Sequence, residues 1–178
     1  MSSHIEAKRE KYGRYADKIA VFNGLPPEYV RQIIHAGETV VYQQGAIITR
    51  EGIASSVMFI VIKGQVSLYD KGVFLRRCVA GESFCEAGVL LKDYRSVSVV
   101  ADMETNLLAL EEHVVRKFFE MGEGKRFLMN FVRVLCEYQL VAHERLLQLH
   151  LTLDNFDEAA SDRIAHRAFE TKPKSASI

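Results

Sequence analysis

Seven short β-rich segments separated by glycines occupy the middle of this chain. The segments are residues 38–42, 46–49, 57–62, 65–69, 73–79, 96–100 and 106–110, with Gly45, Gly52, Gly64, Gly72 and Gly81 between them. Short runs rich in Val, Ile, Phe and Tyr that end at glycine turns are typical of β-strands. Many such strands favour a sandwich or a closed β-roll, and a composition of 48% hydrophobic residues provides the apolar side chains to fill it.

Helical patterns flank the β-rich region on both sides. Residues 5–22 carry aromatic and aliphatic side chains at helical spacing. A second short helix is predicted to begin at Pro27, because proline is favoured in the first turn of a helix. Residues 111–121 predict a further helix, and a glycine-containing turn separates it from a long amphipathic helix over residues 125–151. The predicted fold class is therefore mainly β with flanking α-helices.

The pattern divides the chain into four parts. Residues 1–22 form an N-terminal helical extension, residues 23–121 the β-roll domain, and residues 122–170 the C-terminal helices. Residues 171–178 are rich in Lys, Pro and Ser and are predicted to be disordered. A length of 178 residues is enough for one main hydrophobic core.

Apolar residues of the long helix lie along one broad stripe. It consists of Leu128, Phe131, Val132, Leu135, Tyr138, Ala142, Leu146 and Leu149. A β-roll can cover only part of so long a helix, so the rest of the stripe is predicted to pair with a second copy in a homodimer. The alternative is that the stripe packs back on residues 154–169, which also have a helical pattern with a cap at Asp154 or Asn155.

A short acidic turn and a lone arginine follow the fifth strand segment. Residues 86–88 are predicted to open a helical turn, whose first N–H groups have no partner within the helix and can bind an anion. Arg95, nine positions after Glu86, is predicted to begin a strand and to share one face with Val97 and Val99. A guanidinium on a core-facing side is costly to bury unless an anion meets it, and phosphate accepts its planar fork. The motif predicts a pocket for a small phosphorylated ligand.

Glu86 adds a carboxylate that can accept a hydrogen bond from a sugar hydroxyl. A second interpretation needs no ligand, because Arg95 and Glu86 can simply pair with each other or with other charges. These two residues alone do not separate the interpretations, and the upstream sequence favours the ligand.

The upstream glycines and the motif together resemble the cyclic nucleotide-binding domain family. In that family a glycine precedes an I-I-x-x-E-G stretch, and a phosphate-binding cassette reads roughly F-G-E-x-A-L, followed by an arginine. Gly45 and residues 47–52 match the first part. The cassette is matched by Phe84, Glu86, Leu90, Arg95 and Ser96, and the resemblance extends over residues 22–119.

The resemblance implies a double-stranded β-helix, or jelly roll, that binds a cyclic nucleotide, with cyclic AMP favoured over cyclic GMP. The implied ligand-binding residues are Phe84, Cys85, Glu86, Ala87, Gly88, Arg95 and Ser96. The cyclic phosphate would lie on the N–H groups around Ala87 and Gly88, on Arg95 and on the Ser96 hydroxyl. Glu86 would accept from the ribose 2′-OH.

The resemblance also implies a regulatory output. The base would lie near Gln139 and His143, toward the long helix. Ligand binding would move the C-terminal helices about Gly122 and Gly124, whose backbones can absorb a rotation. The downstream partner protein that reads this movement is not evident from the sequence.

Three residues depart from the family pattern. Cys85 replaces the usual glycine, and a Cβ there restricts the backbone or crowds the turn. Gly88 replaces alanine, and Phe59 replaces the usual tyrosine of the central strand. Cys85 supports an alternative function, a degenerate domain that binds no nucleotide and serves as a protein-interaction or dimerisation scaffold.

Other function classes are not favoured. A formal net charge of zero gives no general attraction to nucleic acid or to an anionic membrane, and the residues after Asp154 lack the second helix and the β wing of a winged helix-turn-helix. No stretch approaches the ~20 apolar residues that span a bilayer. The chain is therefore predicted to bind neither nucleic acid nor membrane.

The cysteines and histidines show no pattern of catalysis or metal binding. Cys78, Cys85 and Cys136 have no paired spacing, which favours reduced thiols and a cytoplasmic location. The six histidines include no HxH pair, so no metal site is predicted. No nucleophile, base and orienting residue occur together, so the chain is not expected to be an enzyme.

Overall fold

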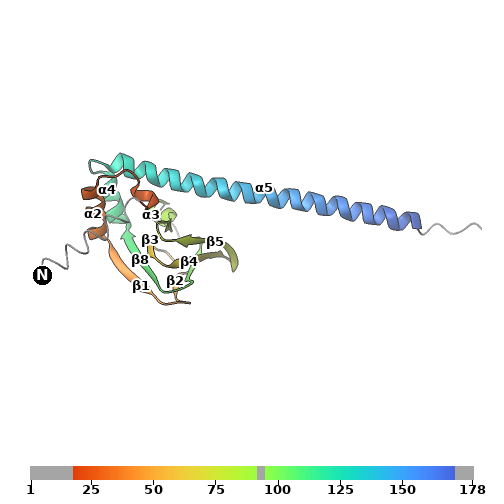
Figure 1. Ribbon diagram of the computed structural model, residues 1–178, viewed down its shortest axis with the longest axis horizontal. Coiled ribbons are helices and arrows are strands. Elements are labelled where there is room, and N and C mark those ends of the chain that lie inside the picture. The colour runs from red at the N-terminus through yellow and green to blue at the C-terminus, as the bar shows by residue number, and fades with distance from the viewer. Residues whose placement is uncertain (1–17, 92–94, 171–178) are drawn as a thin grey trace, which may run out of the picture. The chain divides into compact units, whose positions relative to one another are not determined.

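The computed structural model describes residues 18–91 and 95–170, with side chains as far as residue 153. The strands form two four-stranded antiparallel sheets (Figure 1). In order, the first sheet contains β1 (Glu38–Tyr42), β8 (Thr105–Glu111), β3 (Val57–Lys63) and β6 (Ser83–Phe84). The second contains β2 (Ile47–Thr49), β7 (Ser98–Ala101), β4 (Gln65–Asp70) and β5 (Val73–Val79). This jelly roll with flanking helices confirms the predicted fold class.

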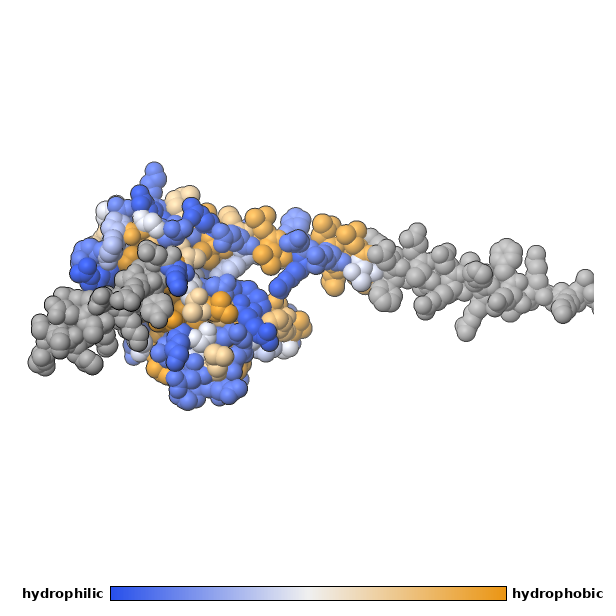
Figure 2. All heavy atoms as spheres, in the orientation of Figure 1, coloured by the Kyte–Doolittle hydropathy of each residue, from blue (hydrophilic) through white to orange (hydrophobic). Residues whose placement is uncertain are grey.

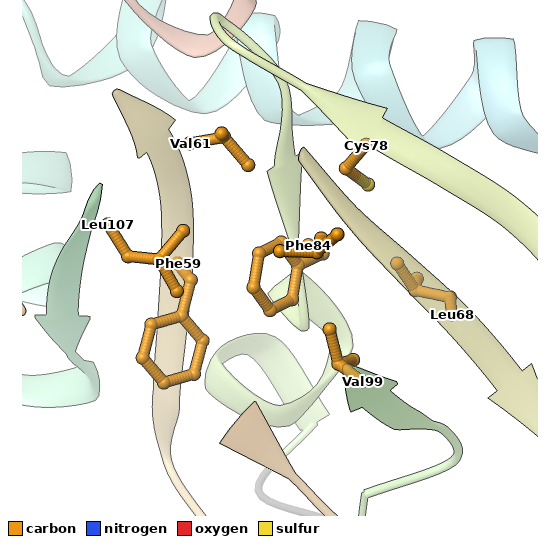
Figure 3. Packing of buried hydrophobic residues seen from close by; sticks show 8 residues of the cluster. Phe59, Val61, Leu68, Cys78, Phe84, Val99 and Leu107 are labelled. Carbon is orange, nitrogen blue, oxygen red and sulfur yellow. The ribbon is translucent and has the colours of Figure 1, made fainter. Parts of the chain in front are cut away.

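The two sheets enclose one apolar core. Figure 3 shows Phe59, Val61, Phe84 and Leu107 of the first sheet beside Leu68, Cys78 and Val99 of the second, and Val66 completes the cluster. The rings of Phe59 and Phe84 are stacked, with centroids 5.2 Å apart. All three cysteines of the chain are free, as predicted. The side chain of Phe84 is fully buried in this core, and the predicted contact of this residue with a ligand stays a prediction.

The helices form a second apolar cluster within the same compact unit. It joins the 3₁₀ turn η1 (Ala20–Phe22), α2 (Pro27–Ala36), α4 (Glu112–Phe119) and the first turns of α5 (Gly124–Glu170). Its aromatic residues are Phe22, Tyr29, Phe118, Phe119, Phe127 and Phe131, with ring centroids 5.0 to 6.3 Å apart. Helices α2 and α4 lie side by side at one end of the sheets (Figure 1).

The N-terminal helix predicted over residues 5–22 is corrected at its end. Residues 20–22 form a 3₁₀ turn and not an α-helix, and residues 5–17 lie outside the described residues. The turn is held by a side chain from α5, because the Asn130 amide donates to the carbonyl oxygens of Val21 and Asn23 at 3.1 and 2.8 Å.

Helix α5 differs from the prediction in two ways. It is continuous from Gly124 to Glu170, so no separate helix begins at Asp154 or Asn155. The chain has neither glycine nor proline between residues 125 and 172, and nothing there interrupts a helix. Its buried face also has a different phase from the predicted stripe, consisting of Phe127, Asn130, Phe131 and Val134, while Leu128 and Val132 are exposed.

The chain forms two compact units, residues 1–134 and 135–178, and α5 passes from the first to the second.

Gly122 and Gly124, the two glycines predicted as a hinge, lie in the turn between α4 and α5, and the packing of this turn requires glycine at one of them. A Cβ on Gly124 would lie 1.9 Å from the Phe119 carbonyl oxygen, so close packing of the turn requires glycine there. A Cβ on Gly122 would have no neighbour within 4 Å.

Candidate functional site

The predicted cassette lies between the first sheet and α4. Strand β6 pairs with β3 through Phe84 opposite Phe59 and Ser83 opposite Ile60. One residue, Cys85, then turns the chain into helix α3 (Glu86–Leu91), which begins at Glu86 as predicted.

Cys85 has a left-handed backbone, with φ of 67°. This region is unfavourable for a residue with a Cβ and suits glycine, which agrees with the expectation that a Cβ at this position meets a restricted backbone. The Cys85 side chain is half-buried against the core, and burial raises the pKa of its thiol to about 11. Cys85 is thus a protonated, packed thiol in a turn that favours glycine.

Glu86 is the acidic group of the site and is only 4% exposed. The Ser83 hydroxyl donates to Glu86 Oε1 at 2.5 Å. Burial raises the pKa of the Glu86 carboxyl, while the hydrogen bond from Ser83, a hydrogen bond from its own backbone N–H and the positive charge of Arg76 lower it. The carboxyl group is therefore held in place at the start of α3.

Arg95 is also 4% exposed, as predicted, but it does not begin a strand. Strand β7 begins at Ser98, because the backbone of Arg95 pairs with a neighbouring loop: its N–H donates to Ile53 and its carbonyl accepts from Gly52. The predicted strand start at Arg95 is therefore wrong, although Arg95 and Val99 are buried and Val97 is half-buried against the core. The loop buries the guanidinium instead.

The Arg95 guanidinium is surrounded by oxygen atoms of the chain. Nη2 donates to Ser55 Oγ at 2.8 Å and to the Val57 carbonyl, and Nη1 lies 3.4 Å from the Cys85 carbonyl oxygen. Its Cζ atom is 5.8 Å from the centre of the Phe59 ring. Within the described part of the chain, the buried Nε atom has no hydrogen-bond partner.

Arg95 and Glu86 form no ion pair with each other among the described residues. The ligand-free interpretation in which they neutralise one another is therefore not what the structure contains. A buried donor without an acceptor costs about 1–3 kcal/mol, and a phosphate oxygen is an acceptor that suits a guanidinium N–H. The residues present fit an anionic ligand at Arg95.

Gly88 brings α3 close to Arg95. A Cβ there would lie 2.9 Å from the Ser55 carbonyl oxygen and 3.2 Å from Arg95 Nη1. The other end of α3 is fixed by Arg116 of α4, whose Nη2 lies 3.5 and 3.4 Å from the carbonyl oxygens of Val89 and Leu90. The short helix is thus held at both ends.

The structure brings together only some of the predicted site residues. Cys85, Glu86, Gly88 and Arg95 lie around the start of α3, and Ala87 and Ser96 are exposed. Gln139 and His143 belong to the second compact unit, so their contact with the base stays a prediction.

Sequence reasoning missed three contributors to the site, Ser55, Ser83 and Arg76. Ser83 and Glu86 follow an S-x-x-E pattern, which signals a capping box in other chains and could have drawn attention to this serine. The contacts of Ser55 and Arg76 join separate segments and leave no local sequence signal.

The described residues contain no group of three or more His, Cys, Asp or Glu side chains arranged to hold a metal ion. None of the described helices combines the length and apolar character needed to cross a bilayer.

Comparison with known proteins identifies the domain. Residues 39–121 match the family model described as "Cyclic nucleotide-binding domain". They form a cyclic nucleotide-binding domain. The chain is 28% identical to human cGMP-dependent protein kinase 2 over 108 residues, which are 57% of this chain and 14% of the kinase.

A second relative matches beyond the domain. The cyclic AMP receptor protein of Thermus thermophilus is 29% identical over 160 residues, covering 82% of this chain and 66% of that protein. The crystal structure of Thermus thermophilus catabolite activator protein superposes with a TM-score of 0.60 and 28% identity, over 79% of this chain and 65% of that one. The chain thus spans less than two thirds of these relatives.

Proposed function

We propose that this chain is a regulatory protein that binds a cyclic nucleotide and has no catalytic activity of its own. The observation that carries the proposal is the Arg95 guanidinium, which is buried and, among the described residues, forms no ion pair with a carboxylate and has an Nε without a hydrogen-bond partner. A cyclic phosphate provides the anion and the acceptor that this group lacks. A regulatory role agrees with the family of the domain.

The proposed pose follows the cassette. Arg95, the N–H groups around Ala87 and Gly88, and the Ser96 hydroxyl contact the cyclic phosphate, while Glu86 accepts from the ribose 2′-OH. Gln139 and His143 contact the base. The names of the relatives divide between the two nucleotides, one a cGMP-dependent kinase and one a cyclic AMP receptor. We propose cyclic AMP as the preferred ligand.

Calorimetric titration of the purified chain with cyclic AMP and, in parallel, cyclic GMP tests the proposal. Saturable binding with a Kd of about 1 μM or below, equal to ~8 kcal/mol, is the expected result. Tighter binding of cyclic GMP would correct the base preference. Absence of heat and of any thermal shift with both nucleotides would contradict the function.

We further propose that α5 forms a parallel homodimer and transmits ligand binding by moving about the turn at Gly122 and Gly124. One face of α5 carries alternating steps of four and three residues, as in a two-stranded coil, at Leu128, Val132, Leu135, Gln139, Ala142, Leu146, Leu149 and Leu153. Five of its apolar side chains are exposed, those of Leu128, Val132, Leu146, Leu149 and Leu153. Figure 2 shows apolar residues in orange along this helix.

Light scattering coupled to gel filtration tests the dimer. The double variant with Leu146→Asp and Leu149→Asp is expected to be monomeric, because it places charges in the proposed interface. Leu140→Asp is the matched control, since this exposed leucine lies outside the four-and-three pattern and its replacement is expected to leave the mass unchanged. A monomeric native chain would overturn the proposal.

A second candidate function is a scaffold that retains the fold without a ligand. The left-handed Cys85 favours it, because its Cβ lies in the turn that places the α3 N–H groups. The same titration separates the two functions, since a scaffold gives no heat with either nucleotide. Its remaining role would then be the homodimer or an unidentified protein partner.

A further inference from the structure

Ser83 is the one hydroxyl that touches the Glu86 carboxyl among the described hydrogen bonds. It lies on β6, is 1% exposed, and donates to Oε1 at 2.5 Å. The serine is itself held from two sides. Its carbonyl oxygen lies 3.3 Å from Arg76 Nη2 and 3.8 Å from Cys78 Sγ, both on β5, and its strand pairs with Ile60 of β3.

We propose that Ser83 is a positioning residue for the ligand's ribose, because it fixes the Glu86 carboxylate so that Oε2 can accept from the 2′-OH. The proposal rests on the cyclic nucleotide function above and assigns a role to a residue outside the predicted cassette. The ribose contact then depends on two residues, Ser83 before Cys85 and Glu86 after it.

Geometry separates this role from simple packing. A carboxylate has two oxygen atoms, and the Ser83 hydroxyl occupies one of them, which restricts rotation of the carboxyl plane. The hydrogen bond also stabilises the charged form, since it lowers the pKa of a carboxyl group that burial raises. A charged oxygen is the stronger acceptor for a sugar hydroxyl.

The role has a consequence that depends on the ligand. If Ser83 acts through Glu86 on the 2′-OH, its loss weakens only those ligands that carry this hydroxyl. A structural defect in the turn would weaken ribose and deoxyribose ligands equally, because the phosphate contacts are common to both.

The experiment measures Kd for cyclic AMP and for 2′-deoxy cyclic AMP with the native chain and with Ser83→Ala. We expect a loss of about tenfold for cyclic AMP and a change of less than about twofold for the deoxy ligand. The matched control is Ser67→Ala, because Ser67 is 2% exposed and also donates to a carboxylate, Asp102 Oδ2 at 2.9 Å, outside the cassette. This control is expected to leave both constants unchanged.

Ser83→Cys is a second variant, which keeps the proposal testable if Ser83→Ala does not fold. It keeps the shape and supplies a weaker donor, so its loss for cyclic AMP should lie between the native chain and Ser83→Ala. Equal losses for both ligands, or native affinity in both variants, overturn the proposal while leaving the proposed function intact. Failure of the native chain to bind either ligand overturns both.

Discussion

Replacement of Arg95 tests whether this buried arginine serves a ligand or the fold. Arg95→Ala removes contacts to three oxygen acceptors, those of Ser55, Val57 and Cys85. At about 1 kcal/mol net for each hydrogen bond, less the relief of the unpartnered Nε, we expect a loss of about 2 kcal/mol in the free energy of unfolding. This corresponds to about 4–8 °C in Tm.

Ligand binding should suffer separately from stability. Loss of a charge-assisted phosphate contact costs ~2 kcal/mol or more, a factor of about 30 in Kd. Arg95→Lys keeps the charge without the planar fork and should lie between the native chain and Arg95→Ala. Thermal unfolding with and without cyclic AMP, together with calorimetry, measures both effects.

A matched control is Arg77→Ala, which removes an arginine with a 64% exposed side chain and its 3.7 Å ion pair with Asp102. It should change neither Tm nor Kd appreciably. If Arg95→Ala lowers Tm but keeps the native ligand affinity, the arginine is structural and the reasoning for a phosphate site fails.

Three further changes test the turn around α3. Cys85→Gly relieves a left-handed backbone worth about 1–2 kcal/mol and loses the packing of the thiol, so we expect little change in Tm and unchanged or tighter binding by calorimetry; weaker binding would give the thiol a direct role. Gly88→Ala places a Cβ 2.9 Å from the Ser55 carbonyl and 3.2 Å from Arg95 Nη1, and should lower Tm and weaken binding together, whereas native values for both would mean that α3 shifts freely. Glu86→Gln removes a buried carboxyl group whose pKa is raised from 4.5 in the folded chain. In the native chain the protonated Glu86 contributes stability that is fully present below pH 4.5 and is lost as pH rises through the raised pKa. Glutamine does not titrate, so the variant should gain stability relative to the native chain as pH rises from 4.5. Unfolding experiments across a pH series measure this difference. The same pH dependence in both proteins would contradict a raised pKa of Glu86.

The sequence predicted the strands well because their signal is local. Alternating or continuous apolar runs between glycines mark each strand without reference to its neighbours, and all seven expected segments contain one. The two-residue β6 was missed, since it is too short to show a pattern. The burial of Arg95 was predicted from its position two and four residues before Val97 and Val99, whereas the burial of Glu86 was not predicted.

Long-range contacts account for what the sequence did not predict. The start of β7 was predicted before Ser98, where the strand begins. The backbone of Arg95 instead pairs with a loop some forty residues earlier in the chain, and this contact leaves no signal in the local sequence pattern. The buried face of α5 was assigned the wrong phase because the helix carries apolar residues on several faces, and only the packing of Phe127 and Phe131 against α2 and α4 selects one of them.

Three costs to folding occur together at the α3 turn. Cys85 adopts a left-handed backbone, Glu86 is a buried carboxyl group, and Arg95 has a buried donor without an acceptor among the described residues. A scaffold could lower all three with ordinary residues, since glycine, glutamine and an apolar side chain fit such positions. A cyclic nucleotide would satisfy two of them, through its phosphate and its 2′-OH. Local conflicts of this kind concentrate at binding sites, and this concentration favours the sensor over the scaffold.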